Sequence, residues 1–311
     1  MIEFIISIFV PLMFLGLIFF LLTGFPVGFA LSAVGLLFGL LGMELGLFPA
    51  TLFQALPLRV FGIMQNEILL AIPFFTLMGI ILERSGMAED LLETVGQVFG
   101  PLRGGLAVAV VLVGALMAAT TGVVAAAVIS MGLISLPIML RYGYNRPIAA
   151  GTITASATLA QILPPSLVLI VLADQLGKSV GDMYKGAWGP SILQILIFAG
   201  YTFALSWIKP HHVPGVPKEA RTLNGWALWA KCLRGIIPSA ILIFAVLGSM
   251  GGLPGLNTAI ATPTEAGAMG CVGALVLAAM HKRLTRELVW EAMVGTMRLS
   301  AMVVFILIGS R

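Results

Sequence analysis

Charged residues are scarce in this sequence. They make up 10% of the 311 residues, whereas hydrophobic residues make up 59%. A soluble domain carries about 25% charged residues, so a soluble fold could not cover this much apolar material. Apolar runs long enough to cross a ~30 Å hydrocarbon core recur along the whole chain. The composition therefore predicts an all-α, polytopic transmembrane helical bundle in a lipid bilayer.

Cysteines are also few, and the motifs of common enzyme chemistries are missing. Cys232 lies in a basic stretch and Cys271 in an apolar run, which suggests neither a disulfide nor a metal site. The sequence has no P-loop, no metal-ligand spacing and no paired-Asp or His-Glu-x-x-His pattern. We therefore expect neither ATP-driven transport by this chain nor intramembrane proteolysis, and we predict no enzymatic activity and no cofactor.

The formal net charge of +4 comes from basic residues in short stretches between the apolar runs. Such residues indicate membrane orientation, so no nucleic-acid partner is expected. Residues 1–10 contain Glu3 and no Lys or Arg, which argues against a cleaved signal peptide. We expect the first apolar run to remain as a helix.

The apolar runs predict transmembrane spans. These runs cover residues 5–22, 25–43, 68–84, 148–173, 187–208, 236–250, 264–280 and 299–309. Residues 106–140 form a longer run, and one straight helix of that length would overshoot the bilayer by about 20 Å. A re-entrant hairpin that returns to the side it started from fits better. Its tip would lie at Thr120, Thr121 and Gly122.

Loop charges agree with a hairpin at 106–140. If the hairpin does not cross the membrane, the basic residues near 141–146, 209–235 and 282–286 all lie on one face of the membrane. By the positive-inside rule this face is cytoplasmic, which places the N-terminus outside. The opposite face then carries residues 174–185, whose charges balance, and 251–263, which are uncharged.

A weak internal repeat predicts the domain organisation. Pro26 opens a small-residue span that is followed by an amphipathic stretch (52–63), and Pro263 opens another that is followed by 284–293. The two units would run in opposite directions, which is a common architecture of secondary transporters.

This repeat divides the chain into three parts. We expect a first repeat at 1–208, a basic cytoplasmic linker at 209–235 and the start of a second, inverted repeat at 236–311. The sequence stops where the second hairpin should begin, so we expect the second repeat to be incomplete.

Polar residues at membrane depth are the candidate site. Backbone that leaves the helix inside a bilayer must be buried in protein or line a wet cavity. At the hairpin tip, freed carbonyls and the hydroxyls of Thr120 and Thr121 are oxygen ligands suited to a hard cation such as Na⁺. The alternative is that Thr and Gly permit close helix packing.

The span at 148–173 repeats this pattern. Its hydroxyl-bearing candidates are Thr152, Thr154 and Ser156, and its interruption contains Gln161, Pro164, Pro165 and Ser166. Adjacent prolines break a helix, and a broken span is a sequence indicator of a transporter binding site. The alternative is a kink whose carbonyls are satisfied by neighbouring Ser and Thr.

Glu265, near the start of its span, could be functional or could make an N-terminal dipole contact at the interface.

The same motifs carry a resemblance to a known family. They are Leu-Arg-Gly-Gly (102–105), Ala-Thr-Thr-Gly (119–122), Leu-Pro-Ile-Met (136–139), Arg-Tyr-Gly-Tyr (141–144), Gln-Ile-Leu-Pro-Pro-Ser (161–166), Gly-Asp-Met-Tyr (181–184) and Thr-Pro-Thr-Glu-Ala (262–266). In this order they resemble the large permease subunit of TRAP (tripartite ATP-independent periplasmic) transporters. The resemblance covers essentially the whole chain.

The resemblance implies a sodium-driven, elevator-type transporter in the bacterial inner membrane. It also implies two partners, a small four-helix membrane subunit and a periplasmic binding protein that delivers an organic acid, commonly a carboxylate. In that family, broken hairpins and their partner spans hold sodium. Carried over, the ion ligands are sought among Thr120, Thr121, Gly122 and Ser156, with Thr152, Thr154 and the break at 164–166 nearby.

This chain departs from the family pattern in two ways. Many members have a Ser-Gly-Ser type tip where this chain has Ala-Thr-Thr-Gly (119–122), and the second hairpin and second broken span are missing by Arg311. Two alternatives stay open. One is an ion-coupled anion carrier that acts without a binding protein, and the other is a membrane scaffold or enzyme.

Overall fold

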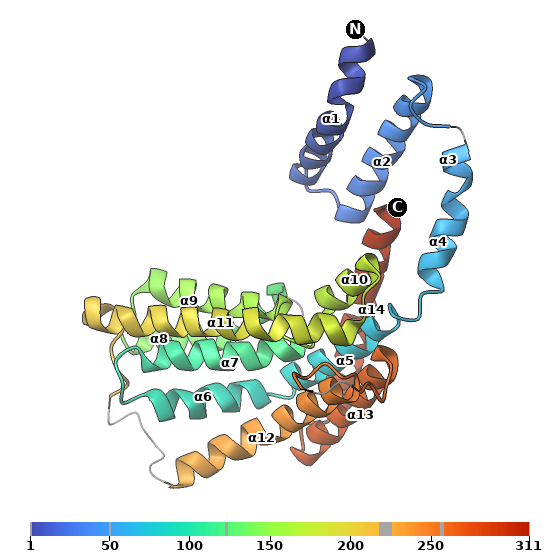
Figure 1. The fold of residues 1–311 in the computed structure, drawn as a ribbon. Coiled ribbons are helices and arrows are strands. Elements are labelled where there is room, and N and C mark those ends of the chain that lie inside the picture. The colour runs from blue at the N-terminus through green and yellow to red at the C-terminus, as the bar shows by residue number, and fades with distance from the viewer. Residues whose placement is uncertain (1, 50, 122–123, 218–225, 256–257, 311) are drawn as a thin grey trace. The chain divides into compact units, whose positions relative to one another are not determined.

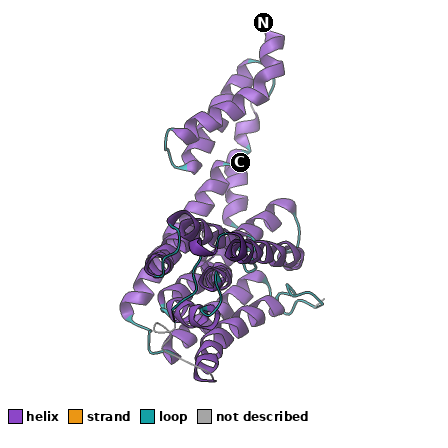
Figure 2. Cartoon of the chain, turned by 90° about the vertical axis from the view of Figure 1, so that its left-hand side faces the viewer, coloured by secondary structure: helices purple, strands orange, loops and turns teal. Residues whose placement is uncertain are grey.

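The computed structural model describes residues 2–49, 51–121, 124–217, 226–255 and 258–310. All regular elements within these ranges are helices (Figure 2), which confirms the all-α prediction. The chain divides into two compact units, Met1–Glu67 with Met297–Arg311, and Ile68–Thr296. These units cut across the predicted repeats, whose boundaries stay a prediction.

The first unit is built from helices packed through aromatic rings. It contains α1 (Ile2–Leu22), α2 (Val27–Glu44), α3 (Thr51–Gln54), α4 (Leu56–Met64) and the second half of α14 (Arg286–Gly309). The ring of Phe9 on α1 meets Phe38 of α2 edge-on, with centroids 5.4 Å apart. On α2, Gly28 lies directly against Phe305 of α14. The missing side chain there lets the two helices approach closely.

The second unit holds the elements predicted to carry the site. It contains α5 (Ala71–Arg84), α6 (Met87–Phe99), α7 (Gly105–Thr121), α8 (Val124–Arg141), α9 (Arg146–Thr158), the 3₁₀ turn η1 (Leu159–Gln161), α10 (Leu167–Leu176), α11 (Val180–Ile208), the 3₁₀ turn η2 (Pro210–His212), α12 (Trp226–Ser249), α13 (Pro263–Met280) and the first half of α14.

Helix α7 is the centre of this unit. It contacts α5, α6, α8, α9 and α11, and α7, α9 and α11 lie side by side (Figure 1). Its sequence is apolar on all sides until Thr120, as expected of a helix buried all round. Ala107, Val110 and Val113 have no exposed surface.

The predicted hairpin is confirmed as the pair α7 and α8, which pack against each other. Their outer ends are joined by the segment after α11, residues 209–216, here called the strap. The Gly104 N–H donates to the Val213 carbonyl at 2.9 Å, and the Asn145 N–H donates to the His212 carbonyl at 3.0 Å. The start of α7 and the end of α8 therefore lie at the same end of the unit, with the base of α9.

The broken span is also confirmed. Helix α9 ends at Thr158, η1 follows, and α10 starts only at Leu167. Residues 162–166 thus interrupt what would otherwise be one continuous helix.

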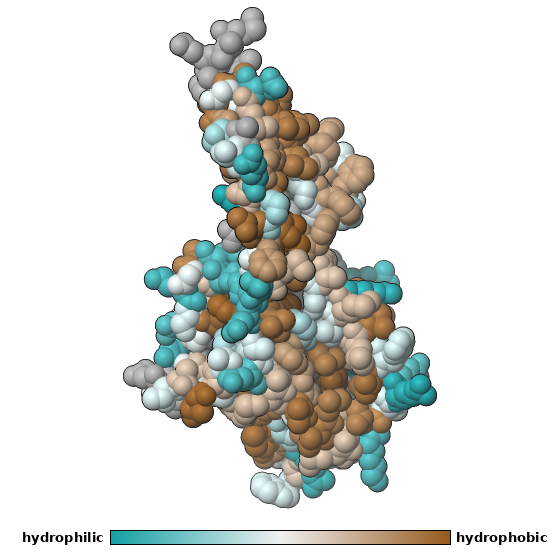
Figure 3. Space-filling model, turned by 90° about the vertical axis from the view of Figure 1, so that its right-hand side faces the viewer, coloured by the Kyte–Doolittle hydropathy of each residue, from teal (hydrophilic) through white to brown (hydrophobic). Residues whose placement is uncertain are grey.

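Several helices are long and apolar enough to cross a bilayer. Within the described residues these are Val27–Glu44, Val180–Ile208, Leu228–Ser249, Pro263–Met280 and Arg286–Gly309. Many large apolar side chains on them are exposed, for example Trp207 at 78%. Apolar surface spreads over much of the face in Figure 3, and hydrophilic groups gather in separate patches. This surface fits a multi-pass membrane protein, whose outer side chains contact lipid.

The start of α11 differs from the prediction. Residues 180–186 were expected in a loop but form the first turns of this helix. Tyr184 is completely buried there, and Asp182 lies in the first turn, where a carboxylate complements the helix dipole. Burial of Tyr184 therefore extends the helix beyond the apolar run.

Two other helices begin before the predicted spans. Helix α12 starts at Trp226, so the last ten residues of the predicted linker are helical. The stretch 284–293 and the span 299–309 form one continuous helix, α14. In α14, Leu288, Ala292 and Thr296 are all buried at spacings of four residues, so the charged half of this helix has a buried face of its own.

Gly114 provides a test of the packing between α7 and α9. A Cβ atom at Gly114 would lie 2.8 Å from the Ser156 Cβ, whereas a Cβ at Gly132 on α8 meets nothing within 4 Å. We expect Gly114→Ala to destabilise the fold by about 1–3 kcal/mol through overpacking. Gly132→Ala should be neutral or stabilising by up to about 1 kcal/mol, because Ala favours helix. Thermal unfolding in detergent measures both, and equal effects would contradict the described contact.

Candidate functional site

The hydroxyl-bearing residues of α9 bond to their own helix. Thr152 Oγ1 donates to the Ile148 carbonyl at 2.8 Å, Thr154 Oγ1 to the Ala150 carbonyl at 3.0 Å, and Ser156 Oγ to the Ile153 carbonyl at 2.9 Å. Each hydroxyl oxygen keeps lone pairs that can accept a further bond or an ion. Thr152 and Ser156 are buried, but Thr154 is exposed. The three residues therefore do not converge on one point.

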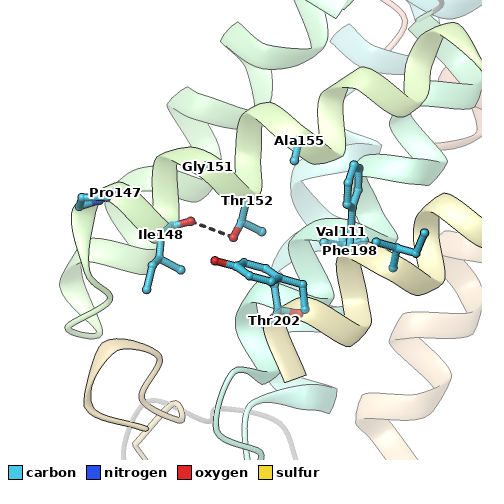
Figure 4. Close-up of a pocket in the computed structure, with 10 residues that line it drawn as sticks. Val111, Pro147, Ile148, Gly151, Thr152, Ala155, Phe198 and Thr202 are labelled. Atoms are coloured by element: carbon cyan, nitrogen blue, oxygen red, sulfur yellow. Dashed lines mark hydrogen bonds between the residues drawn. The ribbon is translucent and has the colours of Figure 1, made fainter. Parts of the chain in front are cut away.

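Thr152 lines a cavity between α7, α9 and α11. The cavity has a volume of about 510 Å³, and its walls are mostly apolar. Labelled side chains from α9 and α11, including Thr152, Phe198 and Thr202, converge on it (Figure 4). No Lys, Arg or His is among its lining residues. Its walls therefore suit an apolar group better than a carboxylate.

Ser156 lies inside the helix bundle. It has no exposed surface, and it faces Gly114 of α7, where a Cβ would also lie 3.4 Å from the Met131 side chain of α8. The side chain is thus enclosed by both arms of the hairpin and by its own helix.

Three carbonyls at the break of the span are satisfied by hydroxyls. Ser166 Oγ donates to the Gln161 carbonyl at 2.6 Å, and Ser191 Oγ of α11 donates to the Ile162 carbonyl at 3.1 Å. The Tyr184 hydroxyl makes a longer bond, 3.4 Å, to the Ser166 carbonyl. For these three carbonyls the structure agrees with the alternative to a binding site, a kink whose freed carbonyls accept hydrogen bonds from nearby hydroxyls.

The middle of the break is different. Leu163, Pro164 and Pro165 are buried, and within the described part of the chain their carbonyl oxygens accept no hydrogen bond. Buried carbonyls are normally paired. The middle of the break therefore presents oxygen atoms that an ion or water could use.

The described end of α7 lies beside this break. The described part of α7 ends at Thr121; the side chains of Thr120 and Thr121, and Gly122 itself, lie outside the described residues. Gly114 and Ser156 are in contact, and α7 and α9 start together at the strap. Six residues further along, α7 reaches Thr120, about 9 Å away at 1.5 Å per residue, and the broken span reaches Ile162 by way of η1. Helix α7 also contacts η1 directly.

Two polar contacts of α5 were not predicted from the sequence. The Ser130 hydroxyl of α8 donates to the Glu83 carboxylate, and Arg84 pairs with Glu291 of α14. The pattern that could have identified them is the Glu-Arg pair that ends the apolar run at 68–84. Ser191 was also missed, although it follows a proline within an otherwise apolar helix.

Glu265 makes the predicted contact at the N-terminal end of its helix. Its carboxylate accepts from the Thr262 N–H at 2.7 Å, and the Thr262 hydroxyl accepts from the Glu265 N–H at 3.3 Å. This capping box satisfies donors at the start of α13, as the second interpretation of Glu265 predicted.

Ser191 tests how the break is held. Ser191→Ala leaves the partly buried Ile162 carbonyl without its donor, so we expect a loss of about 1–3 kcal/mol in stability. The matched control is Ser206→Ala on the same helix, where Ser206 Oγ donates to the Phe203 carbonyl three residues before it. That carbonyl can keep its helical partner, so the control should change stability little. Thermal unfolding compares them, and equal losses would contradict a specific role for Ser191.

Comparison with known proteins places the chain in a family. The family model "Tripartite ATP-independent periplasmic transporter, DctM component" matches residues 14–311. The chain is 31% identical over 263 residues to the C4-dicarboxylate TRAP transporter large permease protein of Pseudomonas aeruginosa, covering 84% of this chain and 58% of that protein. It is 29% identical over 310 residues to the corresponding protein of Rhodobacter capsulatus, covering 94% and 65%.

A third relative has a different named substrate. The 2,3-diketo-L-gulonate TRAP transporter large permease protein of Escherichia coli is 26% identical over 239 residues, covering 76% of this chain and 53% of that protein. The chain thus spans between about half and two thirds of the length of these relatives. It is a multi-pass inner-membrane protein and belongs to the DctM family of TRAP transporter large permease proteins.

Proposed function

We propose that this chain is the membrane permease of a sodium-coupled secondary transporter that imports small organic acids, chiefly carboxylates. The observation that carries the proposal is the common depth of the hairpin tip and the break of the span. Relatives named for C4-dicarboxylate and 2,3-diketo-L-gulonate support an organic acid as the substrate class. Transport is proposed for the complete system, which includes a small membrane subunit and a periplasmic binding protein.

The helix ends at this level suit both an ion and an anion. Helix α7 and the α9–η1 segment both end there, and the C-terminal end of a helix carries partial negative charge that favours a cation. Helices α8 and α10 both start there, and N-terminal ends favour anions. Discontinuous helices of this kind bind substrate and coupling ion in secondary transporters.

We place the sodium ligands at the tip and in the middle of the break. The candidates are the backbone and hydroxyl oxygens of Thr120 and Thr121 and the backbone oxygen of Gly122, together with the carbonyls at 163–165. Ser156 is about 9 Å nearer the hairpin base, so its proposed role is to hold α9 against the hairpin. The exposed Thr154 and Gln161 side chains would face the substrate path.

Sodium dependence tests the coupling. In proteoliposomes with the complete transporter and its binding protein, uptake should follow a sodium gradient and need no ATP. Thr121→Ala should raise the sodium concentration for half-maximal uptake several-fold, because it removes one oxygen ligand. The control is Thr296→Ala on α14, whose hydroxyl bonds to the Ala292 carbonyl at 2.7 Å, and it should leave this concentration unchanged.

Three results would contradict parts of the proposal. Uptake driven by a proton gradient alone would exclude sodium coupling. Full uptake without the binding protein would favour an ion-coupled carrier that acts alone. Equal effects of Thr121→Ala and Thr296→Ala would favour a packing role for the hairpin tip.

A further inference from the structure

A second cavity lies away from the breaks, on the face that the positive-inside pattern assigns to the cytoplasm. It occupies about 430 Å³ between α6, α12 and the end of α13. Its charged or titratable lining residues are all basic: Lys231, Arg234 and His281. Leu91 and Thr94 of α6, with Ala230 and Gly235 of α12, form the rest of the lining. We propose that this cavity binds the phosphate headgroup of an anionic phospholipid.

The donors around the cavity suit a phosphate. Lys231 and Arg234 are one turn apart on α12, so both can reach one group between them. His281 Nδ1 lies 2.8 Å from the Leu277 carbonyl, and because a carbonyl only accepts, Nδ1 carries the proton. The other ring nitrogen can then donate to an anion when the ring is charged. Lys231 also interacts with another residue, but its ammonium has three donors.

The sequence around the cavity keeps an excess of positive charge. Helix α6 includes the acidic residues Glu89, Asp90 and Glu93. The starts of α12 and α14 and the turn between α13 and α14 contain an acidic residue, Glu287, and five basic ones, Lys231, Arg234, Lys282, Arg283 and Arg286, besides His281. Basic pockets between transmembrane helices on the cytoplasmic side are typical sites for anionic lipid headgroups.

An apolar strip next to the cavity indicates a lipid rather than a soluble phosphate. Ile237, Ile241 and Phe244 lie three, seven and ten residues after Arg234, on the same side of α12. They are 45%, 61% and 49% exposed. The ten residues from Arg234 to Phe244 span about 15 Å, which is half of the ~30 Å hydrocarbon core. An acyl chain whose headgroup lies at Arg234 would therefore have an apolar surface along its full length.

Tryptophans mark the level of the cavity. Trp226 and Trp229, at the start of α12, are 82% and 51% exposed. Exposed Trp residues concentrate where the hydrocarbon meets the headgroups. The cavity, which starts at Ala230, thus lies at the depth where a phospholipid carries its phosphate.

Native mass spectrometry of the complete purified protein tests the proposal. With equal phosphatidylglycerol and phosphatidylcholine in the detergent micelle, we expect a several-fold preference for phosphatidylglycerol. Lys231→Gln with Arg234→Gln should abolish this preference. Arg141→Gln with Arg146→Gln, which changes two basic residues of the same face outside the cavity, should keep it.

Two further experiments distinguish a bound lipid from a bound soluble anion. Glycerol phosphate at millimolar concentration, matched in ionic strength with chloride, should not displace the lipid, and Ile241→Ser should weaken its retention. Displacement by glycerol phosphate would instead indicate a soluble anion site. No preference in the unaltered protein, or equal loss in both double variants, would overturn the proposal. Single variants, Lys231→Gln and Arg234→Gln, are used if the double variant unfolds.

Discussion

The fold depends on one constraint: within a bilayer, every backbone polar group needs a partner inside the protein. Most of the chain meets this constraint with continuous helices. It is relaxed at the break after η1 in the second unit, and we expect the same at the tip of the α7–α8 hairpin. At the break, hydroxyls of Ser166, Ser191 and Tyr184 satisfy the outer carbonyls. The carbonyls in the middle accept no hydrogen bond from the described residues, so the packing that stabilises the break also delimits the proposed site.

Helix α7 connects these features. Because it is apolar on all sides, five other helices can pack around it, and Gly114 lets α9 approach within contact of its backbone. The strap at 209–216 then fixes the base of the hairpin and the base of α9 at one level. With both bases at the strap and α7 in direct contact with η1, the end of α7 and the break lie near one level. The proposed site therefore depends on packing near the base, away from the proposed ligands.

Sequence reasoning predicted the helical class, the hairpin at 106–140 and the break at 161–166, because long apolar runs and paired prolines have direct consequences for backbone geometry. Helix starts were less predictable. Residues such as Tyr184 and Cys232 are buried by neighbouring helices, and no local pattern encodes those neighbours. Two of the three donors of the break, Tyr184 and Ser191, come from α11, so Ser191 could not be assigned to it from sequence. Conversely, the hydroxyls of α9 look alike in sequence but differ in burial.

The central claim is that sodium binds between the tip and the break, and accessibility of Gln161 tests it most directly. Its side chain is exposed beside the break, so a cysteine there should react with a maleimide. The buried Cys232 and Cys271 are first replaced by Ala. The account predicts that Na⁺ slows modification of Gln161→Cys several-fold relative to K⁺ at equal ionic strength, because ion binding draws the tip and the break together. Equal rates in the two salts would contradict the account.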